Sequence, residues 1–241
     1  MTINDKLTVI FGVNPVRELL RAKQRTVYNI FITQPAPKCW AEIQKLVPRH
    51  VTITPLSRDQ LTAKSGTVDH QGIVAFVGKL PIRSRCFDPE KQPFIVLLDG
   101  IQDSRNLGAI IRSASCTGIN GVVVPQKNSA PFDGVTAKSS AGLIEYMPIY
   151  QPVSSAIAIK EIQEAGYAIY LATADGADIR TVQFQAPLCL VIGSEGSGIS
   201  SALLKKGQRI AIPQRVSEIS YNASVAAGIL FFFVNSSLKK I

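Results

Sequence analysis

Residues 94–99 read Phe94-Ile-Val-Leu-Leu-Asp99, an unbroken apolar run of strand length that ends in a carboxylate. A strand that faces water on one side alternates apolar and polar residues, so an unbroken run predicts a strand buried on both faces. Such strands are typical of parallel sheets, whose two faces are covered by helices. This stretch therefore predicts an α/β fold.

The chain after residue 93 alternates between strand-like and helix-like patterns. The expected strands are Gly121–Val124, Tyr146–Tyr150, Tyr167–Ala172, Leu188–Ile192 and Arg209–Ile212, and the expected helices are Leu107–Thr117, Val135–Ser140, Ser154–Ala165 and Asn222–Val234. Buried strands that alternate with helices predict a mostly parallel, doubly wound sheet. Ligands bind beyond the carboxyl ends of the strands in such sheets, so we expect the functional residues in loops that follow strands.

The first 78 residues predict a second, smaller α/β unit. Its expected strands are Thr8–Phe11, Val27–Ile32, Val51–Ile53 and Ile73–Val77, and its expected helices are one capped by Asn14 with Pro15 at its first position, Cys39–Val47 and Ser57–Ala63. Residues 79–93 contain several prolines and little periodicity, which predicts a linker. The predicted domains are therefore 1–78 and 94–241, joined by 79–93.

Composition excludes several classes of protein. The chain has 241 residues, of which 46% are hydrophobic and 18% charged, a balance typical of a globular protein rather than a disordered one. No apolar run approaches the roughly 20 residues that a membrane helix needs, and the start has no secretory signal pattern. We therefore expect no membrane segment. We also expect no metal, because the possible ligands are few and widely spaced: Cys39, Cys86, Cys116, Cys189, His50 and His70. The absence of closely spaced cysteines favours reduced thiols and a cytoplasmic location.

The positive charge is concentrated in one third of the chain. Residues 1–86 contain 13 of the 26 Lys and Arg residues but only five of the 17 Asp and Glu residues. Such an excess favours binding to a polyanion, so we expect an RNA or DNA surface in this part of the chain. The alternative is a set of ordinary solvated helix faces. The candidate side chains are those of Arg17, Arg21, Lys23, Arg25, Lys38, Lys45, Arg49, Arg58 and Lys64.

The loop after residues 94–99 carries Asn106 and Arg112. We expect Asn106 to cap the next helix, so that the free amides of its first turn face the cleft. Arg112 lies nearly two turns further on among small and apolar residues, which predicts that it is largely covered. A covered arginine needs an anion from the protein or from a ligand, whereas a surface arginine on an amphipathic helix is the alternative.

The loop after Leu188–Ile192 reads Gly193-Ser-Glu195-Gly-Ser-Gly198. A dinucleotide fingerprint would need glycine at position 195, and a P-loop would need lysine at position 199, where Ile199 stands. The remaining feature is a glycine-lined turn that lets a ligand approach the backbone, with Glu195 at its rim. Taken alone, this stretch is better explained by a tight turn with a capping Glu.

The third loop runs from Ile212 through Ser220 and Tyr221 to Asn222, where a helix rich in Ala and Gly begins. Small residues let such a helix pack closely against another backbone. Taken alone, this loop indicates close packing and no chemistry.

Together the three loops resemble the SpoU (TrmH) class of RNA ribose 2′-O-methyltransferases, within the SPOUT superfamily. The resemblance rests on N-L-G-A-I-I-R-S-A at 106–114, I-G-S-E-G-S-G at 192–198 and I-P through Y-N-A-S-V-A-A-G-I at 212–229, with K-S-S-A-G at 138–142 and E-Y-M-P-I at 145–149 between them. In the front unit, G-V-N-P-V-R-E-L-L at 12–20 and H-Q-G-I-V-A at 70–75 resemble the family's substrate-binding domain, an L30e-like RNA-binding unit. The whole pattern is most similar to bacterial 23S rRNA guanosine-2′-O-methyltransferases.

The resemblance implies a trefoil-knotted C-terminal SPOUT domain, a homodimer, an RNA substrate and S-adenosylmethionine as methyl donor. Carried over by motif, it implies a catalytic group made of Asn106, Arg112, Glu195, Ser220 and Asn222. It also implies that the cofactor is held by Ala172, Thr173, Gly193, Ile212 and Tyr221. Two positions depart from the family pattern: family members often have Pro where this chain has Ser104, and Leu where it has Tyr221. We expect the second difference to change the shape of the pocket wall rather than to abolish activity.

The family proposal makes Arg112 a base, but a guanidinium keeps its proton near neutral pH. We therefore expect Arg112 to bind an RNA phosphate and to stabilise the developing oxyanion, with the proton leaving to that phosphate or to water. Three alternatives stay open: a tRNA methyltransferase, a non-catalytic RNA-binding assembly factor, and a nicotinamide oxidoreductase. The last is disfavoured by the incomplete glycine pattern, and the front unit favours rRNA over tRNA only by analogy.

Overall fold

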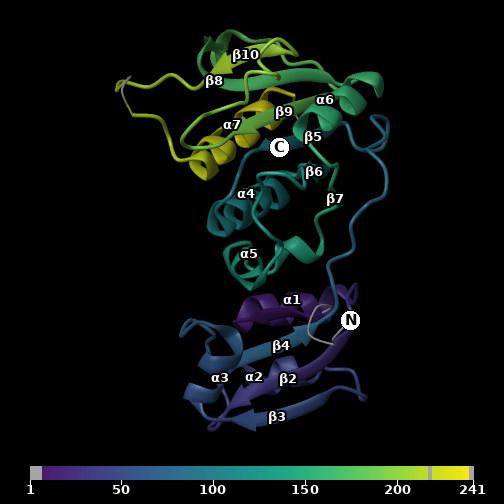
Figure 1. Ribbon diagram of the computed structural model, residues 1–241, viewed down its shortest axis with the longest axis vertical. Helices are drawn as coiled ribbons and strands as arrows, with labels where there is room; N and C mark the ends of the chain where they lie inside the picture. The colour runs from purple at the N-terminus through teal and green to yellow at the C-terminus, as the bar shows by residue number, and fades with distance from the viewer. Residues whose placement is uncertain (1–6, 217–218, 239–241) are drawn as a thin grey trace. The chain divides into compact units, whose positions relative to one another are not determined.

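The computed structural model describes residues 7–216 and 219–238. The chain divides into two compact units (Figure 1). Unit 1 comprises Met1–Pro81 and Pro131–Tyr146, and unit 2 comprises Ile82–Ala130 and Met147–Ile241. The boundaries that we predicted from the sequence stay a prediction, but the contacts place residues 131–146 with the front of the chain.

Unit 2 is built on a parallel sheet, as the apolar run at 94–99 predicted. Within the described residues its strand order is β10-β8-β9-β5-β6-β7, and every neighbouring pair is parallel. β5, the strand of the apolar run, lies inside the sheet between β9 and β6, and all six of its residues are buried. The strands are β5 (Phe94–Asp99), β6 (Gly121–Val123), β7 (Ile149–Tyr150), β8 (Ala168–Asp178), β9 (Leu188–Gly193) and β10 (Gln208–Ala211).

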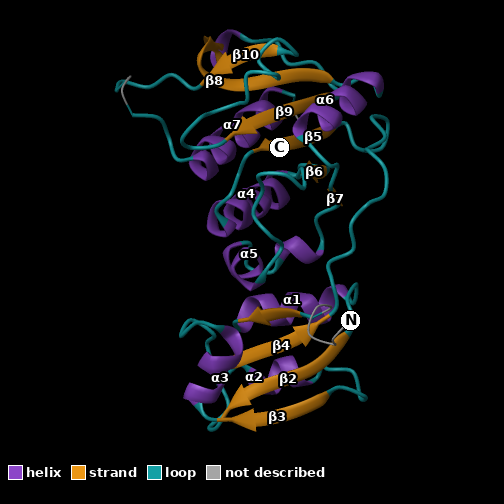
Figure 2. Ribbon diagram, in the orientation of Figure 1, coloured by secondary structure: helices purple, strands orange, loops and turns teal. Residues whose placement is uncertain are grey.

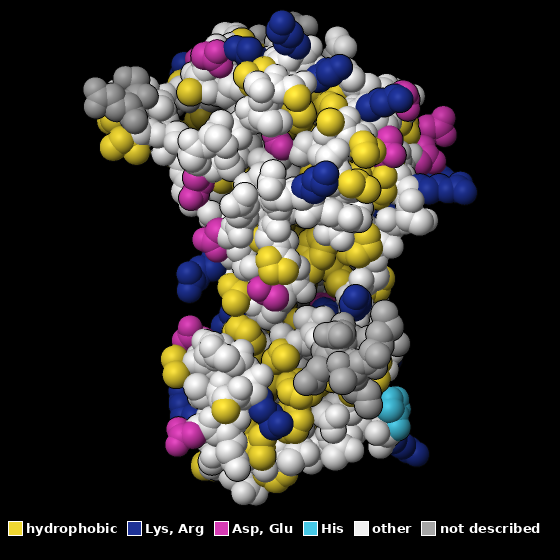
Figure 3. All heavy atoms as spheres, viewed as in Figure 1, with side chains coloured by type: hydrophobic (Ala, Val, Ile, Leu, Met, Phe, Trp, Pro, Cys, Tyr) yellow, Lys and Arg dark blue, Asp and Glu magenta, His cyan; other side chains and the backbone are white. Residues whose placement is uncertain are grey.

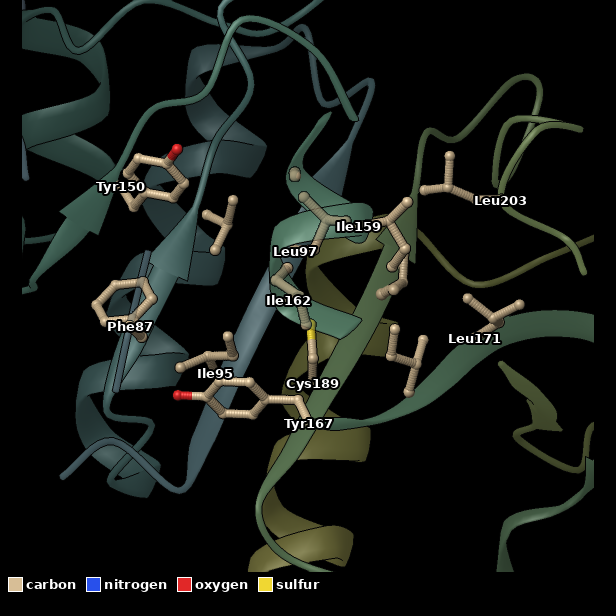
Figure 4. Close-up of a cluster of buried hydrophobic side chains, with 14 of the residues drawn as sticks. Phe87, Ile95, Leu97, Tyr150, Ile159, Ile162, Tyr167, Leu171, Cys189 and Leu203 are labelled. Carbon is tan, nitrogen blue, oxygen red and sulfur yellow. The ribbon is translucent and has the colours of Figure 1, made fainter. Parts of the chain in front are cut away.

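Helices cover both faces of this sheet (Figure 2). On one face, α6 (Ser155–Glu164) packs its Ala158, Ile159 and Ile162 against alternate residues of β5, β8 and β9 in a single buried cluster (Figure 4). α7 (Ala223–Ser237) contributes nothing to that cluster but contacts β9 and α4 (Ser104–Thr117), so it covers the opposite face. The doubly wound architecture is confirmed for the described residues, whereas the trefoil knot stays a prediction.

The segment expected as a linker contributes to the core of unit 2. Phe87 is buried in the cluster under α6, and a Cβ at Gly121 would collide with its ring. The backbone N–H of Arg83 donates to the carbonyl of Ile149 at 2.8 Å. Phe87 and the backbone of Arg83 therefore anchor this segment to unit 2, although most of its other residues are exposed or half-buried and its prolines give no periodic pattern.

Unit 1 has a mixed sheet of four strands within the described residues, in the order β1-β4-β2-β3. Only β2 and β3 are parallel, and the other pairs are antiparallel. The elements are β1 (Thr8–Phe11), α1 (Val13–Ala22), β2 (Val27–Thr33), α2 (Trp40–Gln44), β3 (Thr52–Leu56), α3 (Arg58–Ser65), β4 (Ile73–Val77) and α5 (Gly134–Ser139). This separate α/β unit was expected; its L30e-like character stays a prediction.

Two element boundaries, one in α1 and one at the start of β7, differ clearly from the sequence prediction. α1 begins after Gly12, whose φ of 98° suits glycine, and Asn14 instead accepts a hydrogen bond from Arg17 within the first turn. Residues Leu143–Glu145 form a short 3₁₀ helix, so the strand expected from Tyr146 starts only at Ile149. In both places a local turn outweighs the residue preferences.

One candidate for the nucleic-acid surface is buried. The Arg25 side chain is 1% exposed, and its Nη1 donates to Glu145 Oε1 at 3.0 Å, while its Nε donates to the carbonyl of Gly78. Arg25 is therefore a structural residue of unit 1, and the expectation that it binds RNA is wrong. Lys38, Lys45 and Arg49 are exposed, and the basic side chains in the lower part of Figure 3 stand apart from one another.

The Arg25–Glu145 pair joins residues 131–146 to the front of unit 1. Burial raises the pKa of Glu145, while the charge of Arg25 and the hydrogen bond between them lower it. Arg25 Nη2 and Glu145 Oε2 have no hydrogen-bond partner among the described residues. Removing one member would leave the other charge buried without compensation, which typically costs several kcal/mol.

We expect Arg25→Met to destabilise unit 1 by about 3–5 kcal/mol, and Arg25→Met with Glu145→Leu to recover most of that loss. The measurement is urea unfolding followed by the fluorescence of Trp40, the single tryptophan of the chain, which is buried in unit 1. Arg21→Met is the control, because Arg21 pairs with Glu18 at the surface and should cost no more than about 1 kcal/mol. A double variant as unstable as the single one would show that the uncompensated charge is not the cause.

Candidate functional site

A cavity of about 440 Å³ opens in unit 2 where β8, β9 and β10 end. This volume is within the range of small-molecule sites, roughly 300–1,000 Å³. Its walls come from residues 172–175 within β8, the loop after β9, the segment after β10 and the start of α7. The position agrees with the expectation that ligands bind at the carboxyl ends of parallel strands.

An irregularity in β8 shapes one wall of the cavity. Leu171 lies opposite Arg209, but the next residue of β10, Ile210, lies opposite Ala177, so residues 172–176 form a bulge. Ala172 and Thr173 line the cavity from this bulge. The Thr173 hydroxyl oxygen is buried at this wall, and its hydrogen bond to the Asp175 carboxylate lowers the pKa of that acid.

The loop 193–198 forms the second wall. Ser194 and Gly198 exchange backbone hydrogen bonds of 3.0 Å in both directions, which closes the turn. A Cβ at Gly193 would lie 2.2 Å from the carbonyl carbon of Gly198, so no other residue fits there without a shift. The glycines therefore serve two purposes, a tight turn and a backbone that a ligand can approach.

Glu195 connects this loop to two helices. Its Oε1 accepts a hydrogen bond from Asn106 Nδ2 at 2.8 Å, and Asn222 Nδ2 donates to the same oxygen. Asn222 Nδ2 also donates to Asn106 Oδ1 at 3.1 Å. The three side chains come from positions 106, 195 and 222, and they form one network.

The helix caps differ from the sequence prediction at one of the two helices. Asp103, not Asn106, caps α4, because its Oδ1 accepts from the backbone N–H of Arg105 at 2.8 Å. Asn106 therefore lies inside the first turn, with its side chain free to meet Glu195. Asn222 caps α7 as expected, and its Oδ1 accepts from the backbone of Ser224.

The structure brings most of the candidate residues together. The five residues expected to hold a cofactor all line the cavity: Ala172, Thr173, Gly193, Ile212 and Tyr221. Glu195 and Ser220 line it as well, and Asn106 and Asn222 join it through Glu195. Residues from three separate loops therefore border one space.

Arg112 is not part of this arrangement. It lies on α4, does not line the cavity, is exposed, and makes no hydrogen bond or ion pair with any described residue. The expectation that it is covered is wrong for the single chain, because its apolar neighbours Ile110 and Ile111 are buried on other sides of the helix. Its guanidinium is therefore available to a partner outside the chain.

Sequence reasoning missed Asp175 and Arg209 at the edge of the cavity. Arg209 Nη1 donates to Asp175 Oδ2 at 2.7 Å, and both residues line the cavity. The bulge in β8 places Asp175 there, and the sequence signal for it is weak: a lone Asp-Gly pair at 175–176 inside an apolar run. Gly176 permits the close passage of Ile210, whose backbone would collide with a Cβ.

We expect Gly193→Ala to destabilise unit 2 by about 1–3 kcal/mol, because the new methyl group must push the 193–198 turn away from its position. The matched control is Gly196→Ala in the same turn, where a Cβ would have nothing within 4 Å, and its effect should be within about 0.5 kcal/mol. Thermal unfolding followed by circular dichroism compares the two variants. Equal stability of both variants would show that the close approach at Gly193 is unimportant.

Metal and membrane features are absent from the described part of the chain. Among residues 7–216 and 219–238, no three His, Cys, Asp or Glu side chains gather in a way that could hold a metal ion. In the same residues, no helix is long and apolar enough to cross a bilayer.

The comparisons with protein families match both parts of the chain. Residues 93–232 match the model of the SpoU rRNA methylase family, and residues 9–82 match a model described as RNA 2′-O ribose methyltransferase substrate binding. A parallel sheet with a cavity at its carboxyl edge defines the chain as an α/β protein with a small-molecule site. The chain belongs to the SpoU rRNA methylase family, whose members are RNA methyltransferases.

Individual relatives match almost the whole chain. The putative TrmH family tRNA/rRNA methyltransferase YacO of Bacillus subtilis is 32% identical over 93% of this chain and 94% of its own length. The 23S rRNA (guanosine-2′-O-)-methyltransferase RlmB of Shewanella oneidensis is 31% identical over 94% of this chain and 96% of its own. The crystal structure of an AdoMet-bound rRNA methyltransferase from Sinorhizobium meliloti has the same fold, with a TM-score of 0.82, 21% identity, and coverage of 98% of this chain and 89% of that one.

Proposed function

We propose that this protein methylates a ribose 2′-hydroxyl in RNA with S-adenosylmethionine as donor, and that the acceptor is a guanosine of 23S rRNA. The observation that carries the proposal is the cavity at the ends of β8, β9 and β10, bordered by the Asn106–Glu195–Asn222 network. The name of the Shewanella relative supports the guanosine and the 23S rRNA. The name of the Bacillus relative keeps tRNA as the alternative acceptor.

The cavity fits a nucleoside-containing cation such as S-adenosylmethionine. Thr173 offers a buried hydroxyl at the cavity wall, and Gly193 leaves the backbone of the turn open to close approach. Asp175 and Glu195 both line the cavity; Arg209 already neutralises Asp175, so Glu195 is the carboxylate that favours a positively charged ligand. We propose that Ala172, Thr173, Gly193, Ile212 and Tyr221 hold the cofactor, which when bound supplies an electrophilic methyl group on a sulfonium sulfur.

The Asn106–Glu195–Asn222 network positions groups rather than moving protons. Its two acceptors, Glu195 Oε1 and Asn106 Oδ1, both accept hydrogen bonds from side-chain amides. Glu195 thereby holds the starts of α4 and α7 at a set separation beside the cavity. We place Asn106, Glu195 and Asn222 in the catalytic group on this basis, and Ser220 because it lines the same cavity as Glu195. Their contribution is orientation of the acceptor ribose toward the methyl group, which removes much of the entropic barrier.

Arg112 is proposed to act on the RNA. It is exposed and unpaired within the described chain, so its planar guanidinium can bind a phosphate with two hydrogen bonds. From there it would stabilise negative charge on the attacking 2′-oxygen as the hydroxyl loses its proton to the phosphate or to water. A neutral arginine is not needed for this role.

A homodimer is also proposed. α7 exposes Val225 and Phe232, which are seven residues apart and so lie on one face of the helix; Phe232 is 62% exposed. A second copy of the chain that covered this face would remove apolar surface from water. A location in the cytoplasm, where rRNA is available, is part of the same proposal.

The proposed function is tested by incubating the purified chain with tritiated S-adenosylmethionine and unmodified transcripts of 23S rRNA and of tRNA. We expect radioactivity in 23S rRNA, and one 2′-O-methyl guanosine by primer extension at low nucleotide concentration. Label in tRNA alone would favour the alternative acceptor. If isothermal titration detected no binding of S-adenosylmethionine and no RNA were labelled, the chain would instead be a non-catalytic RNA-binding protein.

We expect Arg112→Lys to lower kcat by about 100-fold, because lysine keeps the charge but loses the planar fork that binds a phosphate bidentately. The affinity for S-adenosylmethionine should stay within about twofold, since Arg112 does not line the cavity. The control is Arg105→Lys, an exposed residue on the first turn of the same helix that also lies outside the cavity lining. Near wild-type turnover of Arg112→Lys would exclude a special role for the guanidinium.

A further inference from the structure

Unit 2 contains a second cavity, of about 710 Å³, beside the first. Residues 194–198 line both cavities, so the turn after β9 is a wall between them. Its other walls follow the neighbouring strands: Gly100 after β5, Lys127 and Asn128 after β6, and Ser154 after β7. The two cavities therefore occupy adjacent stretches of the carboxyl edge of one sheet.

The second cavity also adjoins the catalytic group. Asn106 lines it, and Glu195 lines both cavities. Asn106, in the wall of the second cavity, is therefore hydrogen-bonded to a residue that lines both cavities. A molecule in the second cavity would meet the ligand of the first at this turn.

The charges of the walls disfavour a phosphate inside the second cavity. Asp99, Asp103 and Glu195 line it against the single lysine Lys127, which is exposed at the rim. The two helix starts that face it are already capped, since Asp103 accepts from the backbone of Arg105 and Ser154 accepts from the backbone of Ile157. The helix amides that usually attract an anion are thus partly engaged.

The same walls suit neutral groups that form many hydrogen bonds. Gln102 and Asn128 bring side-chain amides to the lining and Ser197 brings a hydroxyl, whereas the amide of Asn106 is engaged with Glu195 and Asn222. Asp99 is buried, and it accepts hydrogen bonds from Ser155 Oγ at 2.6 Å and from the backbone N–H of Ser200 at 2.7 Å. Each of its carboxylate oxygens therefore already has a partner within the protein. Amides and hydroxyls match the edges of a base and the hydroxyls of a ribose, which carry both donors and acceptors.

We propose that the second cavity receives the acceptor nucleoside of the RNA, base and ribose, turned out from its neighbours, while its phosphates stay outside near Lys127. This inference rests on the proposed function, because it names the place of that reaction's acceptor. A base turned out of single-stranded RNA exposes the edges that proteins read by hydrogen bonds. Gln102, Asn128 and Ser154 are then positions that determine which base is accepted.

The test fills the second cavity and leaves the first untouched. Ala156 is exposed on the first turn of α6 and lines only the second cavity, so Ala156→Trp should block it. Ile157→Trp is the matched control, because the next residue is 43% exposed and lines neither cavity. Ala202→Trp fills the same space from another segment and decides the matter if Ala156→Trp does not fold.

Each variant is measured in three ways with the RNA that the wild type methylates. We expect Ala156→Trp to lower kcat at least 30-fold, while the affinities for S-adenosylmethionine, by titration calorimetry, and for RNA, by filter binding, each change less than threefold. Ile157→Trp should match the wild type in all three measurements.

The outcomes separate this inference from the proposed function. Transfer by Ala156→Trp and Ala202→Trp within threefold of the wild-type rate would overturn the nucleoside cavity and leave the methyltransferase intact. A loss of RNA affinity as large as the loss of rate would also overturn it, by showing a general docking surface. If the wild type labels no RNA, both proposals are wrong.

Discussion

The arrangement of the site depends on one carboxylate that accepts hydrogen bonds from two amides. Glu195 lies on the turn after β9, and Asn106 and Asn222 lie at the starts of α4 and α7. Two helices and a loop that are distant along the chain are thereby held beside one cavity. The turn that carries Glu195 is itself closed by backbone bonds between Ser194 and Gly198, and it can be this tight because Gly193 has no side chain.

The sheet beneath this turn explains why two cavities meet there. Parallel strands present their carboxyl ends at the same edge, so every loop that leaves β5, β6, β7, β8 and β9 opens onto one surface. The bulge in β8 hollows this surface on one side of the 193–198 turn, and the loops after β5 to β7 hollow it on the other. A donor and an acceptor can therefore be held separately and still meet at one residue.

Unit 1 follows a different constraint. Its sheet is covered by α5, which packs on β1, and its interior contains the buried pair of Arg25 and Glu145. A segment that comes late in the sequence is thus part of the fold of the first domain. A chain cut after residue 78 would leave Arg25 without its acid. The remaining exposed cations are still suited to RNA, although they are spread over the surface shown in Figure 3.

Local patterns were enough to predict the parallel sheet, the separate front unit and the three loops of the site, because apolar runs, glycines and capping residues act locally. It also indicated the family, through motifs that keep their spacing. The folded chain was needed to establish that Asp103 rather than Asn106 caps α4, that Arg25 is buried, that Arg112 is exposed and that β8 bulges at residues 172–176. Each of these depends on a partner far along the chain, such as Glu195 for Asn106 or Glu145 for Arg25, and no local pattern encodes which distant group will be there.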